Sequence, residues 1–178
     1  MFDTFSLFSI NAHVATIEDW SEKHRDRLLS LVPDKDKNKK HLTDKIAYTD
    51  YHNNEKPPYY DELIKVLRPY LEDFFKKYNI TEPRIATLWC QKYKSGDYHG
   101  PHDHGSIGYS AVLYAKMNSK VHASTQFFSP FPTEKGSKVS TSIQVKEGDL
   151  IIFPAHLLHM APPHYDDEMR VIFSFNLI

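Results

Sequence analysis

The pair His102 and His104 is the first feature of the sequence whose spacing suggests chemistry. Side chains two residues apart in an extended strand point to the same side of it, about 7 Å apart along the chain. Neutral imidazole binds divalent transition metals, so both rings could reach one ion. Two histidines at this spacing also occur on ordinary protein surfaces, so the pair alone does not define a metal site.

A second chemical feature lies further along the chain. The segment 147–154 predicts a turn followed by an apolar strand, and His156 and His159 come soon after it. Arg170 then begins the alternating apolar run 170–176. Because burial of an unpaired guanidinium is costly, Arg170 predicts an anionic partner. That partner is either a ligand or one of the acidic side chains in the preceding loop, Asp166, Asp167 and Glu168.

Length and composition restrict the classes of protein that could carry these groups. The 178 residues suffice for one domain with a substantial core, and we expect a single domain over residues 1–178. The 22 basic and 23 acidic residues give a formal charge of −1, which argues against binding nucleic acid by broad phosphate neutralisation.

Compartment is predicted from what the sequence lacks. No apolar run is long enough to cross a membrane, and the start of the sequence lacks the basic region of a signal peptide. Cys90 is the single cysteine, so it offers neither an internal disulfide nor a CxxC motif. We therefore predict a cytoplasmic protein.

The first part of the sequence predicts helices. Apolar residues within 17–31 follow helical spacing, with Thr16 as the expected N-cap and Pro33 as the stop. The polar segment 34–45 predicts a solvated loop because its charges are mixed and closely spaced.

A second apolar stripe, within residues 63–78, predicts a longer helix. Pro69 should kink this helix or divide it, because proline removes a backbone hydrogen bond. Such stripes are typical of packing faces, so we expect residues 1–83 to be mainly helical support for a sheet.

After Pro83 the apolar period changes to two. Trp89, Gln91 and Tyr93 share one face of a predicted strand, and Cys90 lies on the other. Strands are expected at 85–93, 109–116, 121–128, 141–145, 150–153 and 170–177. Successive strands without helices between them favour an antiparallel sandwich or jelly roll. We predict an α+β fold with a β core over residues 84–178 and helices packed on its outer face.

This part of the sequence resembles the Fe(II)- and 2-oxoglutarate-dependent dioxygenase superfamily, most closely its small prolyl-hydroxylase-like members of bacteria and phages. The segment Tyr93 to Gly96 is similar to the Tyr-x-x-Gly lead-in of that family, and His102 to the first residue of its proximal ligand pair. His159 resembles the distal ligand, and the run from Arg170 resembles the final strand of the family. The resemblance implies a double-stranded β-helix, a cupin-like jelly roll, and a location in the bacterial cytoplasm.

The resemblance also implies cofactors and the residues that hold them. The implied iron ligands are His102, His104 and His159. The implied residues around 2-oxoglutarate are Arg170, at its distal carboxylate, with Tyr93, Gln91 and Ser174. The protein would be a non-haem iron oxygenase that couples oxidative decarboxylation of 2-oxoglutarate by O₂ to hydroxylation of a substrate. A peptidyl or amino-acid side chain is the candidate substrate.

The sequence departs from the pattern of the superfamily at two positions. Most members carry a carboxylate where this chain has His104, although a minority contain His-x-His. Asp103 is a poor substitute because, one residue from His102, it should point to the opposite face of the strand. Ile172 stands where a hydroxyl often follows the arginine, and Ser174 on the same face could take that part.

Two other functions stay open from the sequence. A three-histidine cupin dioxygenase would use the same ligands without 2-oxoglutarate, and it gives Arg170 no required role. A non-catalytic jelly-roll module could hold zinc or nickel on the same imidazoles. Neither the prime substrate nor the oligomeric state follows from the sequence, and the weak net charge makes nucleic acid an unfavourable substrate.

Several residues keep both a structural and a functional interpretation. Trp89 could floor a pocket or belong to the core, and the segment 48–60 could cover a substrate or simply connect two elements. His156 could line the pocket or lie on the surface. Three histidines have no assignment: His99, His122 and His164.

Overall fold

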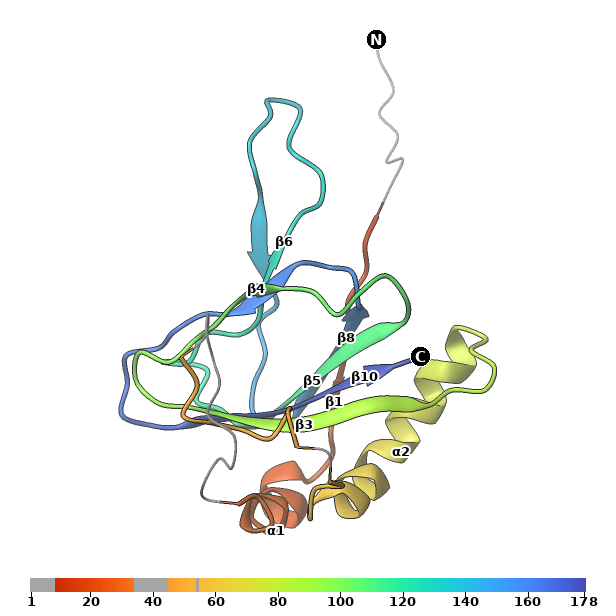
Figure 1. Cartoon of the computed structure of the whole chain (residues 1–178), viewed down its shortest axis with the longest axis vertical. Helices are drawn as coiled ribbons and strands as arrows, with labels where there is room; N and C mark the ends of the chain where they lie inside the picture. Colours follow the sequence, from red (N-terminus) through yellow and green to blue (C-terminus); the bar gives the residue numbers. More distant parts are fainter. Residues whose placement is uncertain (1–8, 34–44, 54) are drawn as a thin grey trace.

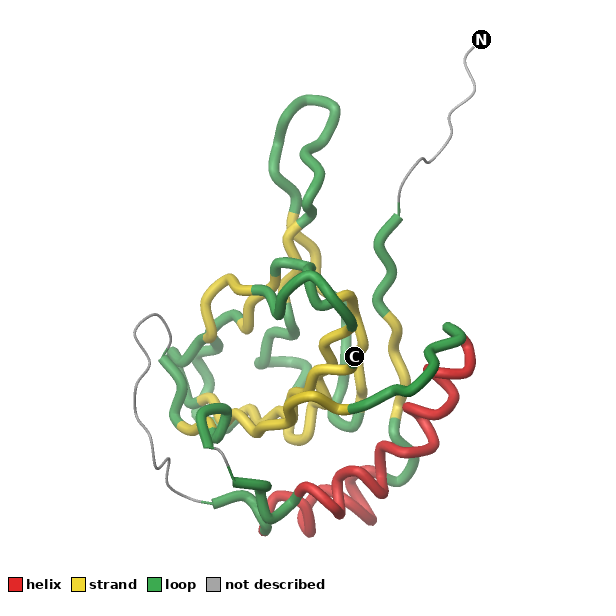
Figure 2. The backbone as a smooth tube through the Cα atoms, turned by 45° about the vertical axis from the view of Figure 1, so that its right-hand side comes forward, coloured by secondary structure: helices red, strands yellow, loops and turns green. Residues whose placement is uncertain are grey.

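The computed structural model describes residues 9–33, 45–53 and 55–178, and two antiparallel sheets dominate it (Figure 1). The larger sheet has the order β1-β8-β5-β10-β3-β2 and the smaller sheet the order β4-β9-β6-β7. Viewed from another side, the strands surround a common interior (Figure 2). This arrangement confirms the predicted jelly-roll, double-stranded β-helix core.

The four long strands of the larger sheet follow the predicted bounds closely, whereas its two short strands lie within residues 1–83, which were expected to be mainly helical. The members of the larger sheet are β1 (His13–Thr16), β2 (Tyr48–Thr49), β3 (Ile85–Tyr93), β5 (Tyr109–Lys116), β8 (Asp149–Pro154) and β10 (Arg170–Leu177). The smaller sheet comprises β4 (His99–His102), β6 (Gln126–Phe128), β7 (Ser140–Ser142) and β9 (His159–Ala161). The sequence did not predict β4 and β9, because such short polar strands carry no alternating apolar signal.

Two predicted strands are shorter than expected. The strand predicted at 121–128 pairs only over Gln126–Phe128. The preceding residues form a turn, because the backbone N–H groups of Val121 and His122 donate to the carbonyl of Asn118. The strand predicted at 141–145 is reduced to Ser140–Ser142 for lack of a partner beyond β6.

Alternation along the central strands divides the apolar side chains into two layers. Tyr93, Phe127, Phe153 and Ile172 belong to a cluster within the β core. Cys90 and Phe173 belong to the outer cluster, together with residues of the helices. Each central strand of the larger sheet is therefore buried on both faces, which fixes its register.

Helix α2 (Tyr60–Lys77) supplies the outer cluster through one face. Leu63, Leu67 and Phe74 are buried in that cluster, and the rings of Tyr59 and Phe173 lie 4.9 Å apart. Both helices lie on the same side of the larger sheet (Figures 1 and 2). The alternative of two helical segments divided at Pro69 is wrong: the residue is exposed within one continuous helix, where water can satisfy the carbonyl that lacks a partner.

The first helix begins later than predicted. Thr16 is not an N-cap: it ends β1, and its Oγ1 donates to Asp149 Oδ1 at 2.7 Å. The chain then forms a π-helical turn, η1 (Trp20–His24), followed by α1 (Arg25–Ser30). Trp20 explains the shift, because its indole N–H donates to the carbonyl of Ala115 and its ring packs against Gly148. A tertiary contact has overridden the capping signal.

The predicted loop 34–45 lies outside the described residues except for Lys45, which pairs with Tyr98. In the described part of the chain no helix combines the length and the apolar character that crossing a membrane would need.

Gly108 joins the segment of His102 and His104 to β5. Its φ is +86°, and a Cβ atom there would lie 2.1 Å from the carbonyl oxygen of Leu177. Its own carbonyl accepts from Ala155, whose carbonyl accepts the backbone N–H of His104. The lack of a side chain at Gly108 therefore lets three segments meet beside the histidines.

We expect Gly108→Ala to lower the free energy of unfolding by about 3 kcal/mol, from left-handed strain plus the backbone clash. Gly136→Ala is the matched control: its φ is +77° but a Cβ atom there meets nothing within 4 Å. The control should lose only about 1 kcal/mol. Urea unfolding measures both, and equal losses would contradict this role for Gly108.

Candidate active site

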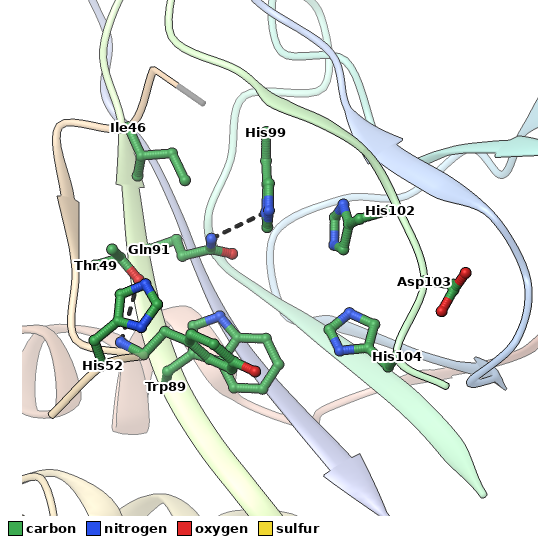
Figure 3. A pocket seen from close by; sticks show the side chains of 10 residues that line it. Ile46, Thr49, His52, Trp89, Gln91, His99, His102, Asp103 and His104 are labelled. Atoms are coloured by element: carbon green, nitrogen blue, oxygen red, sulfur yellow. Dashed lines mark hydrogen bonds between the residues drawn. The ribbon is translucent and has the colours of Figure 1, made fainter. Parts of the chain in front are cut away.

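Strand pairing brings the three predicted histidine ligands together. β4 and β9 are antiparallel, with His102 directly opposite His159. His104 follows β4, and one nitrogen from each of the three rings lies within 4.8 Å of the others. His102 and His104 point toward a common pocket, and Asp103, which also lines that pocket, lies on the other side of the strand from them (Figure 3). The exposed carboxylate of Asp103 instead accepts the backbone N–H of Gly105 at 2.9 Å.

Hydrogen bonds to backbone carbonyls set the tautomers of two of these rings. His102 Nδ1 lies 2.7 Å from the carbonyl oxygen of Gly100, and His159 Nδ1 lies 2.8 Å from that of Leu157. A carbonyl can only accept, so each Nδ1 carries the proton and donates it. Nε2 is therefore the nitrogen that each ring, in its neutral form, would offer to a metal ion.

Burial keeps two rings of the cluster, those of His104 and His159, in the neutral form. Desolvation, and then the neighbouring His102, lowers the pKa of His104 to about 4. The same two causes lower the pKa of His159 to about 3, against the opposing effect of the carbonyl of Leu157. Both rings are therefore unprotonated and available as ligands at neutral pH.

Arg170 is buried at the start of β10, with only 2% of its surface exposed. Its Nη1 donates to the carbonyl of Ala123 at 2.5 Å and its Nη2 to that of Pro162 at 2.9 Å. The guanidinium lies 4.5 Å from the centre of the Tyr93 ring, and Nε has no hydrogen-bond partner among the described residues.

No ion pair forms between Arg170 and the acidic loop residues Asp166, Asp167 and Glu168 in the described part of the chain. The loop partner considered from the sequence is therefore absent. Burial lowers the pKa of the guanidinium, opposed by Tyr93 and Tyr114. A buried cation with spare donors and no acidic partner is the environment that an anionic ligand would complete.

The other predicted cosubstrate residues line the cavity beside the histidines. Gln91, Tyr93 and Ser174 lie on adjacent strands of the larger sheet, with Ser174 opposite Trp89 in the β10–β3 pairing. Ile172 lines the same cavity, as expected for a residue two positions from Ser174 in the same strand. Trp89 is both a pocket residue and almost fully buried, so the two interpretations offered by the sequence coexist.

A wider pocket of about 190 Å³ opens over the histidines (Figure 3). Its outer wall comes from β2 and the turn after it, through Thr49, Tyr51 and His52. The aromatic ring of Tyr51 meets that of Trp89 edge-on, with centroids 4.8 Å apart. Thr49, Tyr51 and His52 belong to the segment 48–60, which the sequence interpreted either as a substrate cover or as a simple connection. These three residues line the pocket.

Asp50 anchors this turn in the core. Its carboxylate accepts the hydroxyl of Tyr59 at 2.7 Å, the backbone N–H of Cys90 at 2.7 Å and, more weakly, the hydroxyl of Tyr48 at 3.3 Å. Burial raises the pKa of Asp50 in spite of these bonds. The anchor ties the pocket wall to β3, the strand that also carries Gln91 and Tyr93.

The remaining histidines take different places. His156 is exposed, in agreement with the surface interpretation. His164 lies 3.2 Å from the carbonyl oxygen of Tyr93, and His122 Nε2 lies 3.0 Å from that of Glu168, so both buried rings brace the segment that leads to Arg170. His99 lies in the pocket itself, 3.8 Å from His102 between ring centres. The sequence offered no signal for this placement, because β4 was not predicted.

Comparison with known protein families gives one decisive match. A family described as putative 2OG-Fe(II) oxygenase matches residues 87–176, just over half of the chain. The chain belongs to this family. The predicted superfamily, enzyme class and cofactors, Fe(II) and 2-oxoglutarate, are thereby confirmed, with O₂ as the second cosubstrate. The family match therefore favours the oxygenase over the two other functions that the sequence left open, the cupin dioxygenase and the non-catalytic module.

Solved structures with the same fold support the architecture of this oxygenase. The viral collagen prolyl hydroxylase of Paramecium bursaria Chlorella virus-1, in its 2OG complex, is 16% identical, with a TM-score of 0.61 over 93% of this chain and 94% of that one. A prolyl-4-hydroxylase of Pseudomonas putida is 14% identical, with a TM-score of 0.57 over 95% and 92%. HygX of Streptomyces hygroscopicus, with nickel and 2-oxoglutarate bound, is 12% identical, with a TM-score of 0.61 over 94% and 82%. Curated proteins give no match.

The lowered pKa values predict how the stability of the metal-free oxygenase depends on pH. His104 and His159 stay neutral in the folded state down to a pH of about 4 and about 3, whereas the unfolded chain protonates them near 6.5. The unfolded state therefore binds more protons below pH 6.5, and the free energy of unfolding should fall as the pH is lowered from 7 to 5.

Urea unfolding at several pH values, with a chelator present, measures this slope. Because His13 and His122 also have lowered pKa values, the double variant His104→Asn/His159→Asn should show a shallower slope rather than none. If the free energy of unfolding depends on pH equally in the parent and the double variant, His104 and His159 do not cause the dependence.

Proposed function

We propose that this oxygenase hydroxylates its substrate at an iron centre held by His102, His104 and His159, without a carboxylate ligand. The observation that carries the proposal is the convergence of three imidazoles, together with a buried arginine over the ring of Tyr93, a residue of the adjoining cavity. Among the described residues this arginine has no acidic partner. Three imidazoles suit a ferrous ion and leave coordination positions open for other ligands.

The neutral ligand set affects the charge of the site. Three imidazoles leave the full 2+ charge of the ion uncompensated, so a dianionic cosubstrate would be bound where two positive groups face it, the ion and Arg170. With iron and 2-oxoglutarate bound, the centre would activate O₂, yielding succinate, CO₂ and the oxidising power for hydroxylation. The protein residues bind, orient and exclude water around this chemistry.

Arg170 would hold the distal carboxylate of 2-oxoglutarate. The two backbone carbonyls orient the guanidinium plane, and Nε together with the remaining Nη protons is available for a charge-assisted contact. Tyr93, Gln91 and Ser174 would complete the walls of the cosubstrate site on β3 and β10.

The prime substrate would enter through the pocket bounded by Tyr51 and His52. No lysine or arginine is among its described lining residues, which suits an uncharged group better than a phosphate-bearing one. We propose a peptidyl or free amino-acid side chain, in keeping with the prolyl hydroxylases among the proteins of the same fold.

We also propose that residues 1–178 act as a single domain, with residues 1–83 supporting a catalytic core over 84–178. Helix α2 and the core share one apolar cluster, which favours a single folding unit. A reducing, cytoplasmic location suits the single cysteine, Cys90, which is buried and free.

The function is tested by an anaerobic visible spectrum and by succinate formation. We expect the parent protein with Fe(II) to develop a charge-transfer absorption when 2-oxoglutarate is added, and to release succinate slowly in air without prime substrate. His159→Ala should bind Fe(II) at least tenfold more weakly and lose both signals. His156→Ala, an exposed histidine nearby, is the control and should keep them.

The absence of any absorption change in the parent would overturn the proposed function. Fe(II) binding by His159→Ala as tight as in the parent would overturn the ligand assignment alone.

Arg170 should determine cosubstrate affinity more than metal affinity. We expect Arg170→Gln to raise the KM for 2-oxoglutarate about 10- to 100-fold, the loss typical of a charge-assisted hydrogen bond, while Fe(II) affinity changes little. Arg84→Gln, at an exposed position, is the matched control. Succinate assays across 2-oxoglutarate concentrations measure this, and an unchanged KM would refute the role.

A further inference from the structure

His99 lies at the boundary between the open pocket and the cosubstrate cavity. Five residues line both spaces: Trp89, Gln91, His99, His102 and His104. Two of them are the proposed ligands on the β4 segment. The other three form the partition between the two spaces, and among these the ring of His99 lies against a ligand (Figure 3).

The contact between His99 and His102 is a parallel stack. Their ring centres are 3.8 Å apart and their planes differ by 16°. The other ring contacts of the ligands within the site are longer or tilted: Trp89 stacks on His104 at 5.6 Å, and His102 meets His159 at 4.3 Å with planes 52° apart. His102 is thus held on one face by a flat neighbour at van der Waals distance.

Gln91 in turn fixes the plane of His99. Its Nε2 lies 3.2 Å from His99 Nδ1, and only 3% of the residue is exposed. An amide nitrogen can only donate, so Nδ1 accepts and His99 carries its proton on Nε2. The amide comes from β3, which pairs with β10 on one side and β2 on the other, so its position is set by the sheet rather than by the pocket.

The stack adds a constraint on the ring plane of His102 to that of its hydrogen bond. The hydrogen bond from Nδ1 to the carbonyl of Gly100 holds one atom of the ring, and a single hydrogen bond by itself does not define the ring plane. A tilt would turn the Nε2 lone pair away from the point where the three histidines converge. A parallel ring on one face opposes the tilt, because stacked aromatic contacts weaken as the planes open.

We propose that His99 is a positioning residue that holds the ring plane of His102 for metal binding, and that Gln91 sets the plane of His99. This inference rests on the proposed ligand set. The stacking face of His99, rather than its nitrogen atoms, is what acts on His102, so a ring without nitrogen should replace it.

Two variants of similar size separate stacking from packing. His99→Phe keeps a flat ring, and His99→Leu fills the space without one. Titration of the metal-free protein with Co(II) under anaerobic conditions, followed by its visible spectrum, reports both affinity and coordination geometry. We expect His99→Leu to weaken Co(II) binding about tenfold, the lower range for support around a metal ligand, and His99→Phe to stay within about threefold of the parent.

Gln91→Leu tests the second half of the inference while leaving His99 in place. It should weaken Co(II) binding by an intermediate factor of about three, and melting temperatures of all variants check that folding is retained. Unchanged binding in His99→Leu, or equal losses in His99→Leu and His99→Phe, would overturn the positioning role. If the leucine variant does not fold, a loss of binding in His99→Phe as large as that of His159→Ala overturns the role, and retention of binding supports it.

Failure of this inference can be told from failure of the proposed function. If the parent binds Fe(II) and develops the absorption with 2-oxoglutarate, and His99→Leu binds Co(II) as tightly as the parent does, only the positioning role is wrong. If the parent itself shows no absorption change, the proposed function fails first.

Discussion

The register between β4 and β9 is the constraint on which the rest of the site depends. It sets His102 opposite His159, although 56 residues of the chain separate them. A slip of one residue in either strand would turn one imidazole to the far face of the smaller sheet, because side chains alternate along a strand. The backbone hydrogen bond from the N–H of His104 to the carbonyl of Ala155 then brings the third ring into the same space. The site is therefore a consequence of strand pairing.

Desolvation is the second physical effect on the site, and it acts on both the histidines and Arg170. It lowers the pKa of His104 and His159, which keeps their lone pairs available, and it leaves Arg170 charged but poorly compensated. Backbone carbonyls rather than acidic side chains orient His102, His159 and Arg170. Carbonyls orient a donor without neutralising its charge, so the histidines can keep their affinity for a metal ion and Arg170 its affinity for an anion.

The sequence predicted the parts of the fold that carry a strong local pattern. Alternating apolar residues identified β3 and β10, an apolar run after a turn identified β8, and the period of three to four identified α2. The bounds predicted for β5 also agree with the structure. It failed where tertiary contacts decide local structure. Trp20 moved the start of the first helix from Thr16, and Asn118 turned the chain where a longer strand was expected. The two short strands that build the site had no periodic signal at all.

By itself the sequence determined the chemistry available: two histidines two residues apart, a third after an apolar strand, and an arginine that opens the last strand, in the order of the oxygenase superfamily. It also determined that Asp103, between two inward histidines, faces outward, because alternation is a local property of the strand. Only the tertiary structure decided that the three rings meet, that Arg170 has no acidic neighbour in the described chain, and that His99 stacks on His102. These facts depend on the pairing and burial of segments distant in the chain, which no local pattern encodes.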